Sequence, residues 1–238
     1  MKNQYFGDVN DYLTYGPLRT LLAVTNLRMA VCWMLTAKDD RNDGRKTGYL
    51  KRPELWRHFD PDLFDCLYEA VVRRKRRHVN VVEKGNLLPG AMYHSAVLGD
   101  RPRQRAQYFT RMAQLARECP LVFFDPDNGM EVKSVPMGRR DSCKYLAWEE
   151  LARFYAAGHS LVVFQHFPRV NHVEFISHLK ATFEDRAGSG MVLPLETSNV
   201  VFFLLPQPEM EDKLAAAARR VAEHWSPNVT LWEKTKSS

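Results

Sequence analysis

The stretch Leu-Val-Phe-Phe-Asp-Pro-Asp-Asn-Gly-Met-Glu-Val-Lys at residues 121–133 decides how the rest of the chain is interpreted. Four apolar residues are followed at once by a carboxylate, a proline, a second carboxylate and an Asn-Gly pair. This pattern is typical of a buried parallel strand that delivers polar groups to the edge of a sheet. Because ligands of open α/β folds bind at that edge, the stretch predicts a functional site beginning at Asp125.

Other apolar runs supply the remaining strands. The predicted strands are residues 29–35, 79–82, 121–124, 161–164, 191–195, 200–205 and 229–232. Helical periodicity lies between them, as at residues 64–72 behind an Asp60 cap and at residues 214–225. The alternation of strands and helices predicts a mainly parallel sheet.

The end of the chain departs from this alternation. Only four residues separate 191–195 from 200–205, too few for a helical crossover, so these strands should pair antiparallel. We therefore expect one α/β domain over residues 1–238, a Rossmann-like three-layer sandwich whose parallel sheet ends in an antiparallel hairpin.

Composition is that of an ordinary globular protein, with 45% hydrophobic residues among 238 and a net charge of +6. No run approaches the roughly 18 apolar residues of a membrane helix, and the first residues lack an apolar signal core, so we expect a cytoplasmic protein. The four cysteines show no zinc-ligand spacing, which favours reduced, mostly buried thiols.

Much of the positive charge is local. The basic positions considered for a nucleic acid are Arg73, Arg74, Arg76, Arg77, Arg139, Arg140 and Arg169, with a further run at Arg101, Arg103, Arg105 and Arg111. Clusters of this kind could hold the phosphates of RNA or DNA. A solvated face that carries favourable cations at a helix end is an equally good interpretation.

Several motifs, in order, resemble those of the bacterial large-subunit ribosomal RNA adenine-N6 methyltransferase family, the RlmJ-like proteins. They are the segment at residues 5–15, Gly48-Tyr49-Leu50, Leu88-Pro89-Gly90-Ala91, Asp125-Pro126-Asp127-Asn128 and the strand, helix and strand that close the chain. The family carries Asp-Pro-Pro-Tyr where this chain has Asp125 to Asn128. It also has a glycine-rich turn after its first strand, whereas residues 35–44 hold one glycine.

The resemblance implies S-adenosylmethionine as cofactor and an adenine-N6-type site on nucleic acid. The residues it implies for the cofactor are Gly7, Asp8, Asp11, Trp33, Thr36 and Glu83. Asp125 would accept a hydrogen bond from an exocyclic amine, Pro126 would hold the turn, and Asn128 would add an amide contact, with Asp127 beside them. A strand-ending turn with Asx capping is the structural alternative.

His166 and Arg169 follow the apolar run 161–164 and should emerge at the same edge as Asp125. His166 could be a base, a ligand or a stacking group, and Arg169 an anion anchor, although such a histidine is more often structural. The segment 133–144, with Arg139 and Arg140, is either a lid over an anionic substrate or a plain surface loop.

Two other functions remain open. Asp125, Asp127, Glu131 and Lys133 resemble the Asp and Glu-x-Lys signature of nucleases that use Mg²⁺, in which carboxylates hold the metal. The spacing is short for that family. A nucleic-acid-binding module without catalysis is the third possibility.

Overall fold

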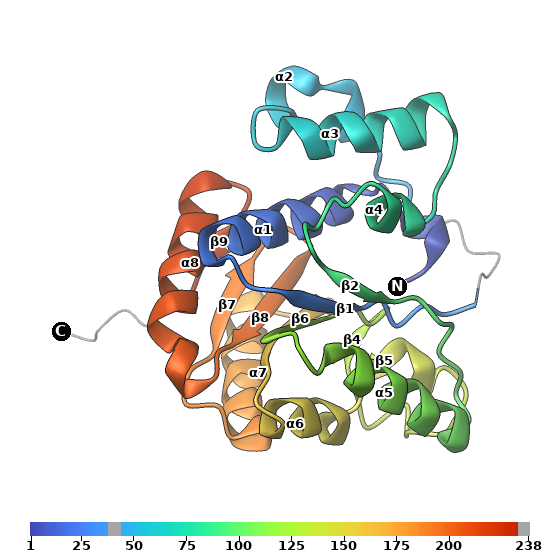
Figure 1. Ribbon diagram of the computed structural model, residues 1–238, viewed down its shortest axis with the longest axis vertical. Coiled ribbons are helices and arrows are strands. Elements are labelled where there is room, and N and C mark those ends of the chain that lie inside the picture. The colour runs from blue at the N-terminus through green and yellow to red at the C-terminus, as the bar shows by residue number, and fades with distance from the viewer. Residues whose placement is uncertain (38–43, 233–238) are drawn as a thin grey trace.

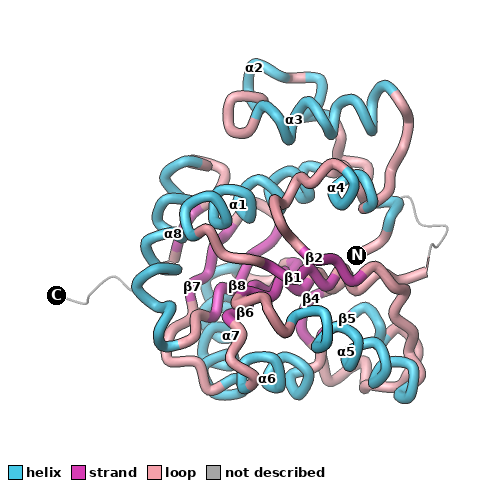
Figure 2. Tube along the Cα trace, in the orientation of Figure 1, coloured by secondary structure: helices cyan, strands magenta, loops and turns pink. Residues whose placement is uncertain are grey.

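The computed structural model describes residues 1–37 and 44–232, and a seven-stranded sheet crosses the centre of this part of the chain (Figures 1 and 2). In spatial order its strands are β2 (Met92–His94), β1 (Met29–Cys32), β3 (Leu121–Phe124), β6 (Ser160–His166), β8 (Val200–Leu205), β7 (Leu193–Glu196) and β9 (Thr230–Leu231). A separate parallel pair consists of β4 (Gly129–Met130) and β5 (Tyr145–Leu146).

Strand directions match the expected topology. The neighbours β2, β1, β3 and β6 run parallel, whereas β8 is antiparallel to both β6 and β7. The α/β fold class, the parallel sheet and the closing antiparallel hairpin are therefore confirmed, and the architecture is Rossmann-like.

Helices cover both faces of the sheet, which makes three layers (Figure 2). One face packs against α1 (Val9–Thr25) and α8 (Glu211–His224), and the other against α5 (Pro102–Ala116), α6 (Trp148–Ala156) and α7 (His172–Ala187). Successive strand residues alternate between the two cores, so Phe123 faces α1 and Phe124 faces α6. None of these described helices combines the length and apolar character needed to cross a membrane.

The chain between β1 and β2 forms a small helical unit, which packs against α1 on the side away from the sheet (Figure 1). It comprises α2 (Pro53–Trp56), α3 (Pro61–Tyr68) with a π-helical turn (Glu69–Arg73), and α4 (Asn80–Lys84). Tyr12 of α1 joins the unit through its ring contacts with Tyr49, Trp56 and Phe64. The expected cap is present, since Asp60 accepts a hydrogen bond from the backbone of Leu63. Short 3₁₀ helices span Asn3–Tyr5, Gly48–Lys51, Ser142–Lys144 and Pro208–Met210.

The predicted strand at residues 79–82 is wrong. These residues belong to the start of α4, and Val79 and Val82 are buried on the same side because a spacing of three residues also suits a helix. The strand at this edge is β2, a three-residue segment too short and too polar to stand out in the sequence. The first predicted strand also ends early, at Cys32.

Candidate active site

A cavity of about 550 Å³ opens where β3 and its neighbour β6 end. Its wall consists of Met1, Lys2, Tyr5, Asp8, Asn10, Asp11, Gly44, Arg45, Lys46, Asp125, Pro126, Asp127, Asn128, Lys144, Phe164 and His166. The polar residues that follow the two strands thus meet at one edge of the sheet, as their positions in the sequence predict. The first turn of α1 closes the cavity from the side.

A glutamine of the neighbouring strand holds the turn that follows β3. Gln165 Oε1 accepts a hydrogen bond from Met130 N (2.8 Å), and its Nε2 donates to Asn128 O (3.2 Å). Gly129 lies between these contacts with φ of +109°, a conformation that favours glycine. A Cβ at this position would clash with the Gln165 amide. Gln165 and Gly129 therefore fix the backbone path of the polar turn, although we assign neither of them a catalytic role.

The carboxyl group of Asp125 is buried in the cavity wall, with 5% of the residue exposed. No side-chain or backbone donor of the described residues forms a hydrogen bond with it. Burial, partly offset by the Met1 amino group and reinforced by Asp127, raises the pKa of Asp125 to about 7. Its oxygens are available to a ligand, and its proton exchanges near neutral pH.

Asp127 is instead bound by the protein. Thr36 Oγ1 donates to Asp127 Oδ2 at 2.7 Å, while the Met1 amino group and Lys2 Nζ lie 3.0 and 3.4 Å from the carboxylate. Burial alone would raise the pKa of Asp127, but Met1, Thr36 and Lys2 outweigh it and lower the pKa below its usual value. Asp127 therefore remains charged and ties the start of the chain to the end of β3.

Met1 fills the crevice between the ends of β1 and β3. Its amino group donates to Asp125 O at 3.0 Å, and its carbonyl accepts from Thr36 N at 3.0 Å. Open α/β sheets usually bind ligands at this position, where the chain connections diverge to opposite sides. The cavity lies beside the crevice, between α1 and β6.

The start of α1 contributes acceptors to the cavity. Asp8 caps the helix by accepting from Asn10 N at 2.9 Å, and Asp11 Oδ2 accepts from Gly7 N at 2.7 Å. Burial, followed by the charges of Asp125 and Asp8, raises the pKa of Asp11 well above its usual value. Asn10 Oδ1 is buried and has no hydrogen-bond partner among the described residues.

This set of acceptors allows a test of whether S-adenosylmethionine suits the site. The cofactor presents a sulfonium cation, an ammonium group and ribose hydroxyls, all of which seek negative charge or hydrogen-bond acceptors. The acceptors of Asp8 and Asp11, together with the unpartnered oxygen of Asn10, suit such a ligand, because buried polar atoms require partners. The Asp11 carboxyl group and the unpartnered Asn10 oxygen are thus the acceptors of the wall that suit the cationic and hydroxyl groups of this cofactor.

His166 and Phe164 provide ring surfaces in the same wall. Their rings meet edge to face, with centroids 4.9 Å apart. Burial, followed by the Met1 amino group, lowers the pKa of His166, so its imidazole is neutral at pH 7. A neutral ring beside a phenyl group is suited to stacking.

Of the six residues considered for the cofactor, Gly7, Trp33, Thr36 and Glu83 lie outside the cavity wall, and Gly7 contacts it through the hydrogen bond from its N–H to Asp11. Trp33 is fully buried, and its Nε1 donates to Glu83 Oε1 at 3.0 Å. Glu83 belongs to α4 and also accepts from Ser95 Oγ at 2.6 Å. Thr36 reaches the cavity only through Asp127, whereas Asp8 and Asp11 line it directly.

The residues of the alternative Mg²⁺-dependent nuclease site do not come together in the described part of the chain. Glu131 is absent from the cavity wall, and its Oε1 accepts from Trp148 N at the start of α6. Lys133 is exposed to solvent. In the described residues, no three His, Cys, Asp or Glu side chains are arranged to hold a metal ion.

The basic residues divide into exposed and structural groups. Those on the surface are Arg73, Arg74, Arg76, Arg139, Arg140 and Arg169. Arg77 is half-buried and donates to the carbonyls of Tyr5, Phe6 and Gly44, which line or adjoin the cavity. Arg105 is buried in a double contact with Glu150, so its grouping with surface arginines is wrong.

Four residues contribute to this arrangement in ways that were not expected from the sequence. Gln165 precedes His166 near the end of a strand. Its polar character at that position was the only feature of the sequence that indicated a role for it. Asn10 belongs to the N-terminal motif, but in the sequence it looks like an ordinary polar residue of a helix surface. Nothing in the sequence pattern indicates that Met1 and Lys2 bind Asp127.

The chain matches no family model and no curated protein. Its chemistry must therefore be inferred from the cavity.

Proposed function

We propose that the protein transfers a methyl group from S-adenosylmethionine to an amino nitrogen of a nucleobase. The observation that carries this proposal is the buried Asp125 carboxyl group, which faces the cavity without a hydrogen-bond donor from the described residues. An exocyclic amine is a neutral donor that such a carboxyl group can bind at neutral pH. The order of the motifs along the chain and the Rossmann-like sheet are further support.

Asp125 would accept a hydrogen bond from one N–H of the amine and so direct the nitrogen lone pair away from itself. The cofactor, when bound, supplies the electrophilic methyl group. After transfer the nitrogen carries an additional proton, and Asp125, with a pKa of about 7, can accept it. Most of the rate enhancement then comes from positioning.

The aromatic group that the family motif provides is replaced by Asn128 in this chain. In our proposal Phe164 and His166 supply the ring faces for the base, and Asn128 adds an amide contact from the same wall. The exposed arginines, Arg139 and Arg140 among them, would contact the phosphates.

Calorimetric titration with S-adenosylmethionine, followed by transfer of labelled methyl groups to RNA and DNA oligonucleotides, tests the proposal. Asp125→Asn should lower kcat at least about 100-fold while cofactor affinity stays within a few-fold, because the asparagine keeps the shape but not the proton acceptor. The exposed Asp185→Asn is the control. Absence of heat at millimolar cofactor would overturn the proposal, and metal-dependent cleavage lost in Lys133→Ala would favour the nuclease.

A further inference from the structure

An open groove of about 580 Å³ adjoins the cavity across the turn between β7 and β8. Asn199 links the two, because it lines the groove and its Oδ1 accepts a hydrogen bond from Lys46 Nζ of the cavity wall. A ligand seated in the cavity could therefore extend into the groove without leaving the surface.

Stacked rings contribute to the groove. Phe167 and His172 lie parallel, with centroids 3.6 Å apart and planes 10° from coplanar. His172 is anchored, since its Nδ1 lies 3.1 Å from Glu196 Oε1, and 38% of its side chain is exposed. A fixed, partly exposed ring system is a platform for a base.

Arg169 supplies the charge of the groove. It is exposed, and no carboxylate of the described residues forms an ion pair with it. The described residues that line the groove include no carboxylate, and Glu196, which contacts His172 from outside the lining, also accepts a hydrogen bond from Trp232 Nε1. The available charge is therefore positive and complementary to a phosphate.

Asp125 is only 5% exposed, so a base must leave its stack to reach it, and this costs the least free energy in a single strand. We propose that the substrate is a single-stranded nucleic acid and that the groove binds the nucleotide next to the target base. This inference rests on the function proposed above. His172 and Phe167 stack the neighbouring base, while Arg169 contacts its phosphate.

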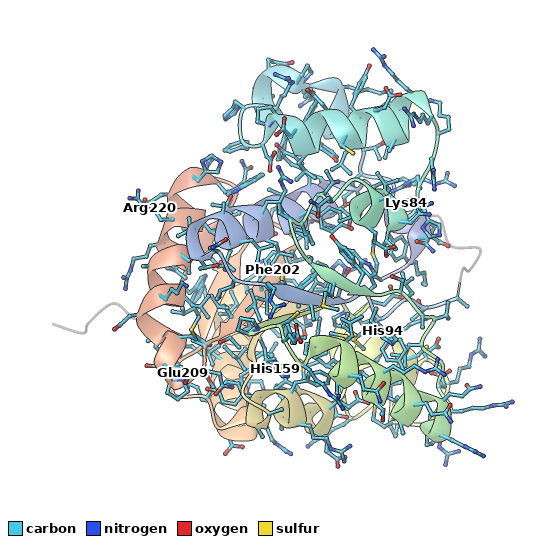
Figure 3. All side chains as sticks on the ribbon, in the orientation of Figure 1. Lys84, His94, His159, Phe202, Glu209 and Arg220 are labelled. Carbon is cyan, nitrogen blue, oxygen red and sulfur yellow. The ribbon has the colours of Figure 1, made fainter. Side chains whose placement is uncertain are left out.

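Fluorescence anisotropy with labelled oligonucleotides of about 12 nucleotides tests the inference. Single-stranded RNA and DNA probes separate the two sources, and a duplex of the same sequence should bind at least about tenfold more weakly. Arg169→Ala should lower affinity about 3- to 10-fold and reduce the slope of log K against log salt by about 0.7. The control is Arg220→Ala, whose residue lies on the outer face of α8 (Figure 3) and should bind as the wild type.

A second variant isolates the stacking contact. His172→Ala should lower affinity about fivefold or more for a normal strand, yet leave affinity unchanged for a probe whose target adenine is flanked by abasic nucleotides. Circular dichroism checks that each variant is folded.

The outcomes separate the two proposals. Equal binding of duplex and single strand, or Arg169→Ala and His172→Ala variants that bind like the wild type, would overturn the groove alone. Groove-dependent binding without heat from S-adenosylmethionine would refute methyl transfer and leave the groove. A wild-type chain that binds no oligonucleotide would overturn both.

Discussion

Replacing Asp125 by asparagine should stabilise the protein relative to wild type as the pH rises. The carboxyl group is buried and has a folded-state pKa of about 7, above the unfolded value of about 3.8. Between these values the folded state binds more protons than the unfolded state, so wild-type stability falls as pH rises from about 4 to about 7. Asparagine has no such proton and avoids this loss.

The magnitude follows from the two pKa values. In the wild type the unfolded chain loses the Asp125 proton at a lower pH than the folded state does. At 1.36 kcal/mol for each pKa unit, this difference lowers the free energy of unfolding by roughly 2 kcal/mol at pH 5 and roughly 4 kcal/mol at pH 8. The constant cost of burying the asparagine amide cancels in the difference between the two pH values. The variant should therefore gain roughly 2–3 kcal/mol in unfolding free energy relative to the wild type over this interval. The charge of Asp125 also raises the pKa of Asp11, so removing that charge adds to the stability gained by the variant at high pH.

Urea unfolding of both proteins at pH 5 and pH 8 measures this change. Asp185→Asn is the matched control, because its side chain is 81% exposed and its difference from wild type should change by less than about 0.5 kcal/mol. If the Asp125→Asn difference changed as little as the control, the carboxyl group would titrate normally and the basis of the proposed site would fail. If Asp125→Asn also loses methyl transfer, the gain in stability at high pH would show that the wild-type residue lowers stability in favour of activity.

Three further substitutions test the scaffold around the cavity by urea unfolding. Gly129→Ala should cost about 2–4 kcal/mol, from the left-handed backbone and a displaced hydrogen-bonding amide, whereas Gly188→Ala, with open space around it, should cost only about 1 kcal/mol. Equal costs would mean that the clash is absent. Met34→Gly should destabilise by about 1–3 kcal/mol, because the lost burial exceeds the relieved backbone strain, and a stabilised variant would contradict this order. Arg105→Met should cost about 3–5 kcal/mol, because the largely buried Glu150 carboxylate loses its cation and keeps the backbone N–H of Ala147 as a donor, and a neutral result would show that water reaches it.

The sheet was largely predictable because burial leaves a strong imprint on the sequence. β3 and β8 coincide with their predicted ranges, since each is a continuous apolar run bounded by turn residues. The short connection before Val200 dictated the antiparallel pairing. Edge elements carry no such imprint, which is why β2 was missed and the valines of α4 were assigned to a strand.

The site was predictable in outline only. Asp125 and His166 were expected at one edge because parallel strands end together, and both line the cavity. Which carboxylate faces a ligand was not predictable, since Asp125 and Asp127 have similar neighbours in sequence. Their environments differ because the Met1 amino group and Lys2 Nζ, more than 100 residues earlier, lie 3.0 and 3.4 Å from the Asp127 carboxylate, whereas Met1 donates to the backbone carbonyl of Asp125.

The chain just after β1 contains a left-handed residue that is not a glycine. A glycine-rich turn was absent from the sequence, and residues 38–43 of that segment lie outside the described residues. Met34 nevertheless adopts a left-handed conformation with φ of +44°, and Tyr108 Oη accepts a hydrogen bond from its backbone N–H at 3.1 Å. The fully buried Met34 side chain packs into the α5 side of the core and offsets the backbone strain. Met34 therefore holds a left-handed conformation without being a glycine, at the cost of a strain that its buried side chain offsets.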